Sequence, residues 1–70
     1  MLSNYEAAVD YLNKSIEINP KSAETRNNLG LALQDQGKYD DAIKQYNCAL
    51  NIKPDYPEAY SNLIGIFPYY

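Results

Sequence analysis

The sequence predicts an all-α fold, in which antiparallel helical hairpins stack into a short α-solenoid of about four helices. Three observations predict it: apolar residues recur at helical spacing, residues 34 positions apart match, and no segment alternates as a strand would. We expect residues 1–70 to form one small domain. Within it, residues 4–19 are predicted as the second helix of a partial unit, 23–56 as a complete unit, and 57–67 as the first helix of a partial unit.

The internal repeat rests on identical residues that lie 34 positions apart. The pairs are Tyr5 and Tyr39, Ala8 and Ala42, Asn13 and Asn47, Ile18 and Ile52, Pro20 and Pro54, Glu24 and Glu58, Asn28 and Asn62, and Leu29 and Leu63. A spacing of this size is typical of helical hairpins, which cannot bury their apolar faces alone and therefore stack on one another.

Residues 4–19 are predicted to be one amphipathic helix. Its apolar face consists of Tyr5, Ala8, Val9, Leu12, Ser15 and Ile16. This face matches the second helix of the complete unit, so we expect it to be exposed where a first helix would normally cover it.

The first helix of the complete unit is predicted to begin after Ser22, as N-cap, and to end near Gly37, a natural left-handed C-cap. Leu29, Gly30 and Leu33 share one face of it. A glycine inside a helix costs about 1 kcal/mol relative to alanine. We therefore expect close backbone approach at Gly30, against small residues of the next helix, Ala42 and Ala49.

The second helix of the complete unit carries an apolar stripe made of Tyr39, Ala42, Ile43, Tyr46, Ala49 and Leu50. Asp40 and Asp41 near its start favour the positive end of the helix dipole, and Pro54 follows its end. The last helix, 57–67, opens with Pro57 in the favoured first turn and is expected to stop at Pro68. Its apolar residues are Tyr60, Leu63, Ile64 and Phe67.

Residues 23–56 resemble a complete tetratricopeptide repeat, so the predicted hairpins are of tetratricopeptide-repeat type. The resemblance is carried by Leu29, Gly30, Gly37, Tyr39, Ala42, Tyr46, Ala49 and Pro54, and it extends in partial form to residues 4–22 and 57–67. The chain departs from the family pattern at Ser15, Arg26, Leu33 and Ile64. The resemblance implies a superhelix whose first helices line a concave surface that holds a peptide or a partner helix.

The candidate peptide-binding residues lie on the face of the first helices that the apolar pattern leaves over. They are Glu24, Asn27, Asn28, Leu31 and Asp35, with Glu58 and Asn62 as the matches of Glu24 and Asn28. A carboxamide is both donor and acceptor, so Asn28 and Asn62 could grip a peptide backbone without reading its side chains. Their repetition resembles the asparagine ladder of O-linked N-acetylglucosamine transferase repeats.

Composition narrows the function classes. Net charge is -3, and six scattered basic residues form no stripe, so we expect no nucleic-acid partner. We also expect no membrane span, a cytoplasmic location, and an inert, partly exposed Cys48. Histidine is absent and no nucleophile has a base at motif spacing, so no catalytic, metal or cofactor site is predicted.

Three functions remain open from the sequence. The first is a non-catalytic protein-interaction module that presents a concave groove. The second is a fragment of the substrate-recognition array of a larger enzyme, such as an O-linked N-acetylglucosamine transferase. The third is a structural unit that assembles with itself, head to tail, through its unpaired terminal helices.

Overall fold

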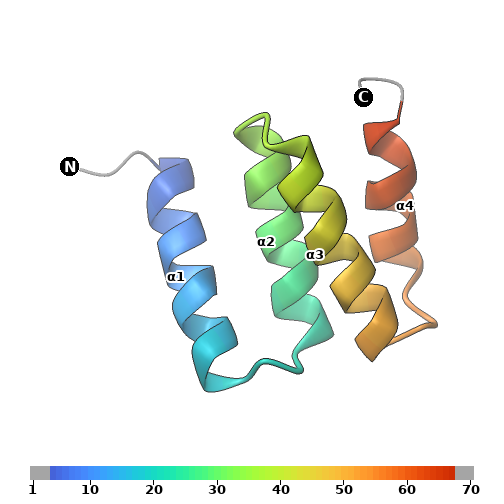
Figure 1. Cartoon of the computed structure of the whole chain (residues 1–70), viewed down its shortest axis with the longest axis horizontal. Helices are drawn as coiled ribbons and strands as arrows, with labels where there is room; N and C mark the ends of the chain where they lie inside the picture. Colours follow the sequence, from blue (N-terminus) through green and yellow to red (C-terminus); the bar gives the residue numbers. More distant parts are fainter. Residues whose placement is uncertain (1–3, 68–70) are drawn as a thin grey trace.

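The computed structural model describes residues 4–67, and these form four helices: α1 (Asn4–Ile18), α2 (Ala23–Asp35), α3 (Tyr39–Ile52) and α4 (Pro57–Ile66). The helices lie side by side, with α1 and α4 at opposite edges, and each runs antiparallel to the one before it (Figure 1). The described residues contain no strand. The predicted all-α fold of antiparallel hairpins is confirmed.

Local signals in the sequence determine where α2 begins and ends. The Ser22 hydroxyl accepts a hydrogen bond of 3.2 Å from the Thr25 N–H, as an N-cap does. At the other end, Gly37 has a φ of 79°, and the N–H of Lys38 donates to the carbonyl of Leu33 at 2.9 Å. This is a Schellman C-cap, which satisfies carbonyls that the helix leaves unpaired. Both predicted caps are confirmed.

The starts of the last two helices also follow the sequence. Asp40 and Asp41 lie in the first turn of α3, and Pro57 lies in the first turn of α4. α4 ends at Ile66. Pro68, which we expected to stop this helix, lies outside the described residues.

The core consists of two apolar clusters, which tie the four helices together. The larger contains the buried residues Leu29, Leu33, Ala42, Tyr46 and Ile66, with Val9, Leu12, Ile16, Tyr39, Ile43 and Leu63 packed against it. The smaller contains Ala23, Ala49, Tyr56 and Ala59, with Leu50 packed against it. Tyr46 and Ile66 are the largest side chains that are fully buried, so they anchor the centre of the core.

Gly30 lies at a close contact, as expected, but its partner differs from the predicted one. A Cβ atom at this position would lie 2.5 Å from Cε1 and 2.7 Å from Cδ1 of Tyr46. The ring of Tyr46, and not the small side chains of Ala42 and Ala49, therefore occupies the space that glycine leaves. An aromatic ring packed this closely against a helix backbone needs a residue without a side chain at the point of contact.

The inward face of α4 is a second correction to the sequence pattern. Ala59 and Ile66 are fully buried and Leu63 is half-buried, whereas Tyr60, Ile64 and Phe67 are 49%, 64% and 59% exposed. Residues 59, 63 and 66 follow the spacing of one helix face, and they point at α2 and α3. Tyr60, Ile64 and Phe67 therefore leave an exposed apolar edge on α4. The face of α1 that the sequence predicts to be exposed is instead mostly half-buried, because Val9, Leu12 and Ile16 pack against the larger core cluster.

Candidate functional site

The candidate site is the face where the two first-type helices, α2 and α4, lie next to each other. The backbone of α2 approaches those of α1, α3 and α4, whereas no Cα atom of α1 lies within 8 Å of a Cα atom of α3 in the described residues. α2 and α4 approach each other, whereas α1 and α3 do not. The row of helices is therefore bent, with α2 and α4 on its inner side. We call this surface the α2/α4 face, and its residues are Glu24, Asn28, Leu31, Asp35, Glu58 and Asn62.

Four of the predicted residues form an exposed row along α2. Glu24, Asn28, Leu31 and Asp35 are all exposed, and Leu31 retains 38% of its exposure. Their spacing of four, three and four residues places them on one side of the helix. Within residues 4–67, the side chains of the three polar members make no hydrogen bond or ion pair. Solvent is their present partner, so a ligand could replace it without breaking an internal bond.

Asn27 does not belong to this row, contrary to the sequence prediction. It is only 3% exposed, and its Oδ1 accepts a hydrogen bond of 2.9 Å from Nδ2 of Asn62. Asn27 faces α4 because it lies one residue around the helix from Asn28, a rotation of about 100°. Its carboxamide therefore joins α2 to α4, and the role we infer for it is to position Asn62.

Asn28 and Asn62 match in sequence but differ in environment. Asn28 is exposed, whereas Asn62 is half-buried and already uses one N–H in its bond with Asn27. Asn62 makes no other side-chain hydrogen bond within the described residues, so its Oδ1 can still accept one. A held carboxamide loses little freedom when it binds, which favours Asn62 as a fixed contact and Asn28 as an adaptable one.

Tyr56 is a residue of this region that the sequence analysis missed. It is 8% exposed, and Nζ of Lys53 lies 4.8 Å from the centre of its ring. Its pKa is raised, first by burial and then by the charges of Glu58 and Glu24, while a hydrogen bond with Asn27 acts in the opposite direction. An aromatic residue directly before Pro57 was the available signal, since the turn before a helix often buries such a side chain.

The raised pKa of Tyr56 also shows how the charges are arranged. Glu24 and Glu58 lie in the first turns of α2 and α4, at the same end of the α2/α4 face, and the charge of each adds to burial in raising the pKa of Tyr56. Asp35 adds a third negative charge at the other end of the row on α2. The residues of the face include no basic side chain, and Lys53 places its Nζ 4.8 Å from the centre of the Tyr56 ring at the end where Glu24 and Glu58 lie. The face therefore favours a cationic ligand.

The α2/α4 face is an open surface whose side chains are mostly exposed. The described residues form no enclosed pocket and no cluster of side chains that could hold a metal ion. Cys48, on α3, is a free, half-buried thiol. Between residues 4 and 67, no helix combines the length and the apolar character that a bilayer span requires. What the face offers is carboxamides, carboxylates and one apolar side chain on an open surface.

Two family profiles match this chain. One, described as TPR repeat, covers residues 32–63, and the other, described as Tetratricopeptide repeat, covers residues 11–44. Their overlap is the end of α2 and the start of α3, so the matched segments together run from α1 into α4.

This chain is similar to a part of each of three longer curated relatives. The mitochondrial import receptor subunit TOM70 of Saccharomyces cerevisiae is 51% identical over 53 residues, which is 66% of this chain and 8% of the relative. Small glutamine-rich tetratricopeptide repeat-containing protein 2 of Mycosarcoma maydis is 37% identical over 60 residues, 86% of this chain and 17% of the relative. Protein O-mannosyl-transferase TMTC1 of Homo sapiens is 30% identical over 67 residues, 90% of this chain and 8% of the relative. The chain therefore spans a small part of each.

Proposed function

The chain belongs to the tetratricopeptide repeat family, and we propose that it is a non-catalytic protein-interaction module whose α2/α4 face holds an extended peptide segment of a partner. Repeats of this family generally mediate contacts between proteins. The observation that carries the proposal is the exposed row of Glu24, Asn28, Leu31 and Asp35, whose polar side chains have no partner within the described residues.

The chemistry of the face indicates what the peptide should carry. Asn28 and Asn62 offer both donors and acceptors to a peptide backbone, and Leu31 offers an apolar contact between the polar positions. Glu24 and Glu58, which act together on Tyr56, favour a lysine or arginine at that end. The ligand we propose is therefore an extended segment with a positive charge and no fixed side-chain sequence between its charges.

Binding by two first-type helices should be weak. A hydrogen bond contributes a net free energy of about 0.5–1.5 kcal/mol, and an ion pair on an exposed surface contributes roughly 0–1 kcal/mol. A few such contacts correspond to a dissociation constant near millimolar, which is about -4 kcal/mol.

The test is a titration by NMR with two synthetic peptides of equal length, one alternating lysine with threonine and one alternating glutamate with threonine. We expect the lysine peptide to shift the amide signals of the α2/α4 face and the glutamate peptide to leave them unchanged. Raising the salt concentration should weaken the shift, since the charges are exposed.

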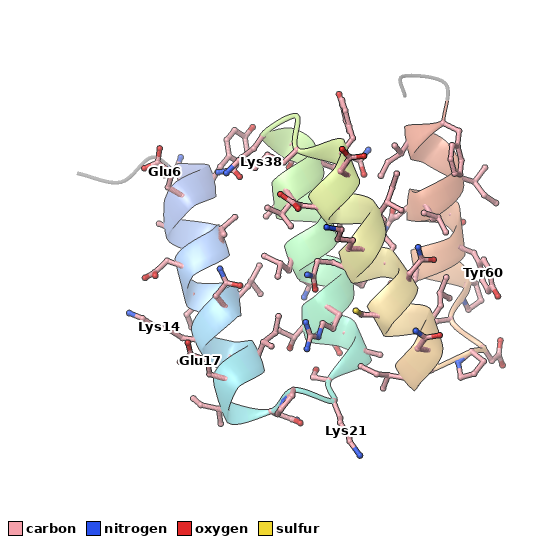
Figure 2. The ribbon with its side chains drawn as sticks, viewed as in Figure 1. Glu6, Lys14, Glu17, Lys21, Lys38 and Tyr60 are labelled. Carbon is pink, nitrogen blue, oxygen red and sulfur yellow. The ribbon has the colours of Figure 1, made fainter. Side chains whose placement is uncertain are left out.

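Variants then assign the binding to named residues. Asn28→Ala combined with Asn62→Ala should weaken binding about tenfold, since it removes the backbone contacts. Glu24→Gln should also weaken it, and Glu17→Gln, an exposed carboxylate on α1 (Figure 2), is the matched control with no expected effect. Unchanged affinity in the asparagine double variant, or shifts confined to α1 and α3, would contradict the proposal.

A second candidate is favoured by one observation, the similarity to human Protein O-mannosyl-transferase TMTC1 over 90% of this chain. In this alternative the chain is one piece of the repeat array of a larger glycosyltransferase, and the same face recognises the protein substrate. Reading the open reading frame on both sides of these residues separates the two candidates, because only the second requires a catalytic domain in the same polypeptide.

A further inference from the structure

We propose that a second copy of this chain docks head to tail, with α1 of one copy covering α4 of the next as α3 covers α2 within the chain. This contact is separate from the α2/α4 face and does not depend on peptide binding. α1 and α4 are at opposite edges of the fold, so each copy presents one half of the contact at each end (Figure 1). The repeat supplies the register, because residues 5–18 of α1 and 57–66 of α4 have their equivalents 34 positions away in α3 and α2.

Within residues 4–67, the two halves of the internal contact recur at the edges of the fold without a partner. Within the chain, Ala42, Tyr46 and Ala49 of α3 are 0% exposed beneath α2 and its neighbours. Their equivalents in α1, which are Ala8, Leu12 and Ser15, are only half-buried. On the other side, Gly30 and Leu33 of α2 are buried, whereas their equivalents Ile64 and Phe67 are 64% and 59% exposed.

At the position of the Gly30 and Tyr46 contact, the side chains at the two edges differ in size from those inside the chain. Inside the chain a small residue, Gly30, lies beneath a large one, Tyr46, with no room for a Cβ atom. At the edges the residue equivalent to Gly30 is the larger Ile64, and the residue equivalent to Tyr46 is the smaller Leu12. Ile64 would clash with a tyrosine in this register, and the shorter side chain of leucine reduces that clash.

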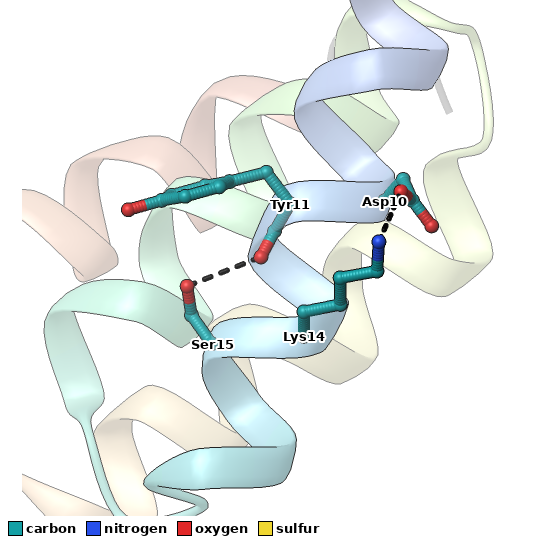
Figure 3. Close-up of polar contacts among 4 residues, drawn as sticks. All are labelled: Asp10, Tyr11, Lys14 and Ser15. Carbon is teal, nitrogen blue, oxygen red and sulfur yellow. Dashed lines mark hydrogen bonds and ion pairs between the residues drawn. The ribbon is translucent and has the colours of Figure 1, made fainter.

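A second pair of edge residues matches in the same register. Within the chain, Nη1 of Arg26 donates a hydrogen bond of 3.2 Å to Oε1 of Gln45, across α2 and α3. The equivalent residues at the edges are Tyr60 and Tyr11, which are 49% and 69% exposed. Figure 2 shows Tyr60 on the outer side of α4, and Figure 3 shows Tyr11 extending from α1. Docking brings these rings together, so two exposed aromatic side chains that have no partner across helices would gain one.

Ser15 is the one polar residue at the centre of the α1 half, where α3 has the fully buried Ala49. Its hydroxyl donates to the carbonyl of Tyr11 within the same helix at 3.1 Å (Figure 3). Covering Ser15 therefore leaves no donor without an acceptor. The charged side chains nearby, Asp10 and Lys14, pair with each other at 3.3 Å and remain 56% and 70% exposed, so they need not be desolvated.

The contact joins two different surfaces, so each added copy presents a fresh α4. Such an arrangement either closes into a ring or continues as a filament. The mass of the assembly therefore grows with concentration beyond that of a dimer. A contact between two α4 helices would instead give an assembly no larger than a dimer.

The test is sedimentation equilibrium of the 70-residue chain from micromolar to millimolar concentration, with three variants. Ile64→Arg disables the α4 half and Ala8→Arg disables the α1 half. Ile18→Arg is the matched control, because Ile18 is 86% exposed and its equivalent, Ile52, belongs to neither core cluster. Circular dichroism checks the helix content of each variant.

We expect the average mass of the parent and of Ile18→Arg to rise with concentration. Ile64→Arg and Ala8→Arg should each remain monomeric when measured separately. Mixed together, the two disabled variants should form a one-to-one heterodimer, because one retains α1 and the other retains α4. That heterodimer also shows that both variants fold. A parent that stays monomeric at every concentration, an Ala8→Arg variant that still self-associates, or a mixture that gives no heterodimer overturns the proposal.

Discussion

The contact between Gly30 and Tyr46 predicts opposite effects for the same substitution at two glycines. Gly30→Ala places a Cβ atom 2.5 Å from Cε1, 2.7 Å from Cδ1 and 3.0 Å from Cζ of Tyr46, whereas a Cβ atom at Gly65 meets nothing within 4 Å. Both glycines lie inside helices, α2 and α4. Alanine is the better helix former at each, so any difference in sign comes from packing.

The magnitude follows from how little Tyr46 can move. Its side chain is 0% exposed, and its hydroxyl donates to Oε1 of Gln34 at 2.7 Å. Overpacking costs about 1–3 kcal/mol, and a held ring places Gly30→Ala near the upper end. Subtracting about 1 kcal/mol of gained helix propensity leaves a net loss of about 2 kcal/mol. Gly65→Ala should gain about 0.5–1 kcal/mol, so the two variants should differ by close to 3 kcal/mol.

The assay is urea unfolding followed by circular dichroism, at a concentration where the parent is monomeric. A difference of 1 kcal/mol moves the melting temperature of a domain this small by about 4–8 °C, so thermal scans should show the same order. Tyr46→Leu is the second arm, because it removes the ring and should make Gly30→Ala less harmful in the double variant than in the single one. Gly30→Leu should lose about 2 kcal/mol or more. If Gly30→Ala proves as stable as Gly65→Ala, the close contact does not constrain the fold.

Three further predictions concern the caps and the buried phenol. Ser22→Ala, which removes the acceptor for the Thr25 N–H, should lower the free energy of unfolding by about 1 kcal/mol, and Ser22→Asp should preserve it; equal loss in both variants would contradict capping. Gly37→Ala should cost about 1–2 kcal/mol because φ is 79° there, with Gly37→Asn less harmful, as measured by thermal unfolding. Burial first, and then the charge of Asp35, raises the pKa of Tyr46 from 10.0 to about 12. The unfolded phenol ionises first as the pH rises, so this stabilisation is complete below pH 10 and is lost toward pH 12, on the order of 2 kcal/mol. Tyr46→Phe should not lose this stabilisation as the pH rises. If the free energy of unfolding in urea depends on pH in the same way for both proteins, the prediction is wrong.

The α2/α4 face shows what helical spacing can and cannot predict. The spacing correctly places Glu24, Asn28, Leu31 and Asp35 on one exposed side. It fails at Asn27, because a residue next to this row is exposed or buried according to whether another helix lies beside it. Here α4 lies beside α2, and the bond between Asn27 and Asn62 is made across 35 positions of the chain. No local pattern contains that information.

The sequence by itself determined the elements of this fold, because the signals for them are local. A serine that caps, a glycine that adopts positive φ and a proline in a first turn act on their own helix, and Ser22, Gly37 and Pro57 do so where they were expected to. The 34-residue spacing of matched residues adds the hairpin arrangement, since every unit must bury the same face.

Only the tertiary structure decided which side chains share the interior. Gly30 was correctly expected to lie at a close contact, but the packing of α3 assigned the space to the ring of Tyr46 rather than to Ala42 or Ala49. In the same way, the packing of α4 on its neighbours buried Ile66 and left Ile64 exposed. The reason is geometric: helical periodicity tells which residues share a face, whereas the relative rotation and distance of two packed helices decide which residues of that face meet.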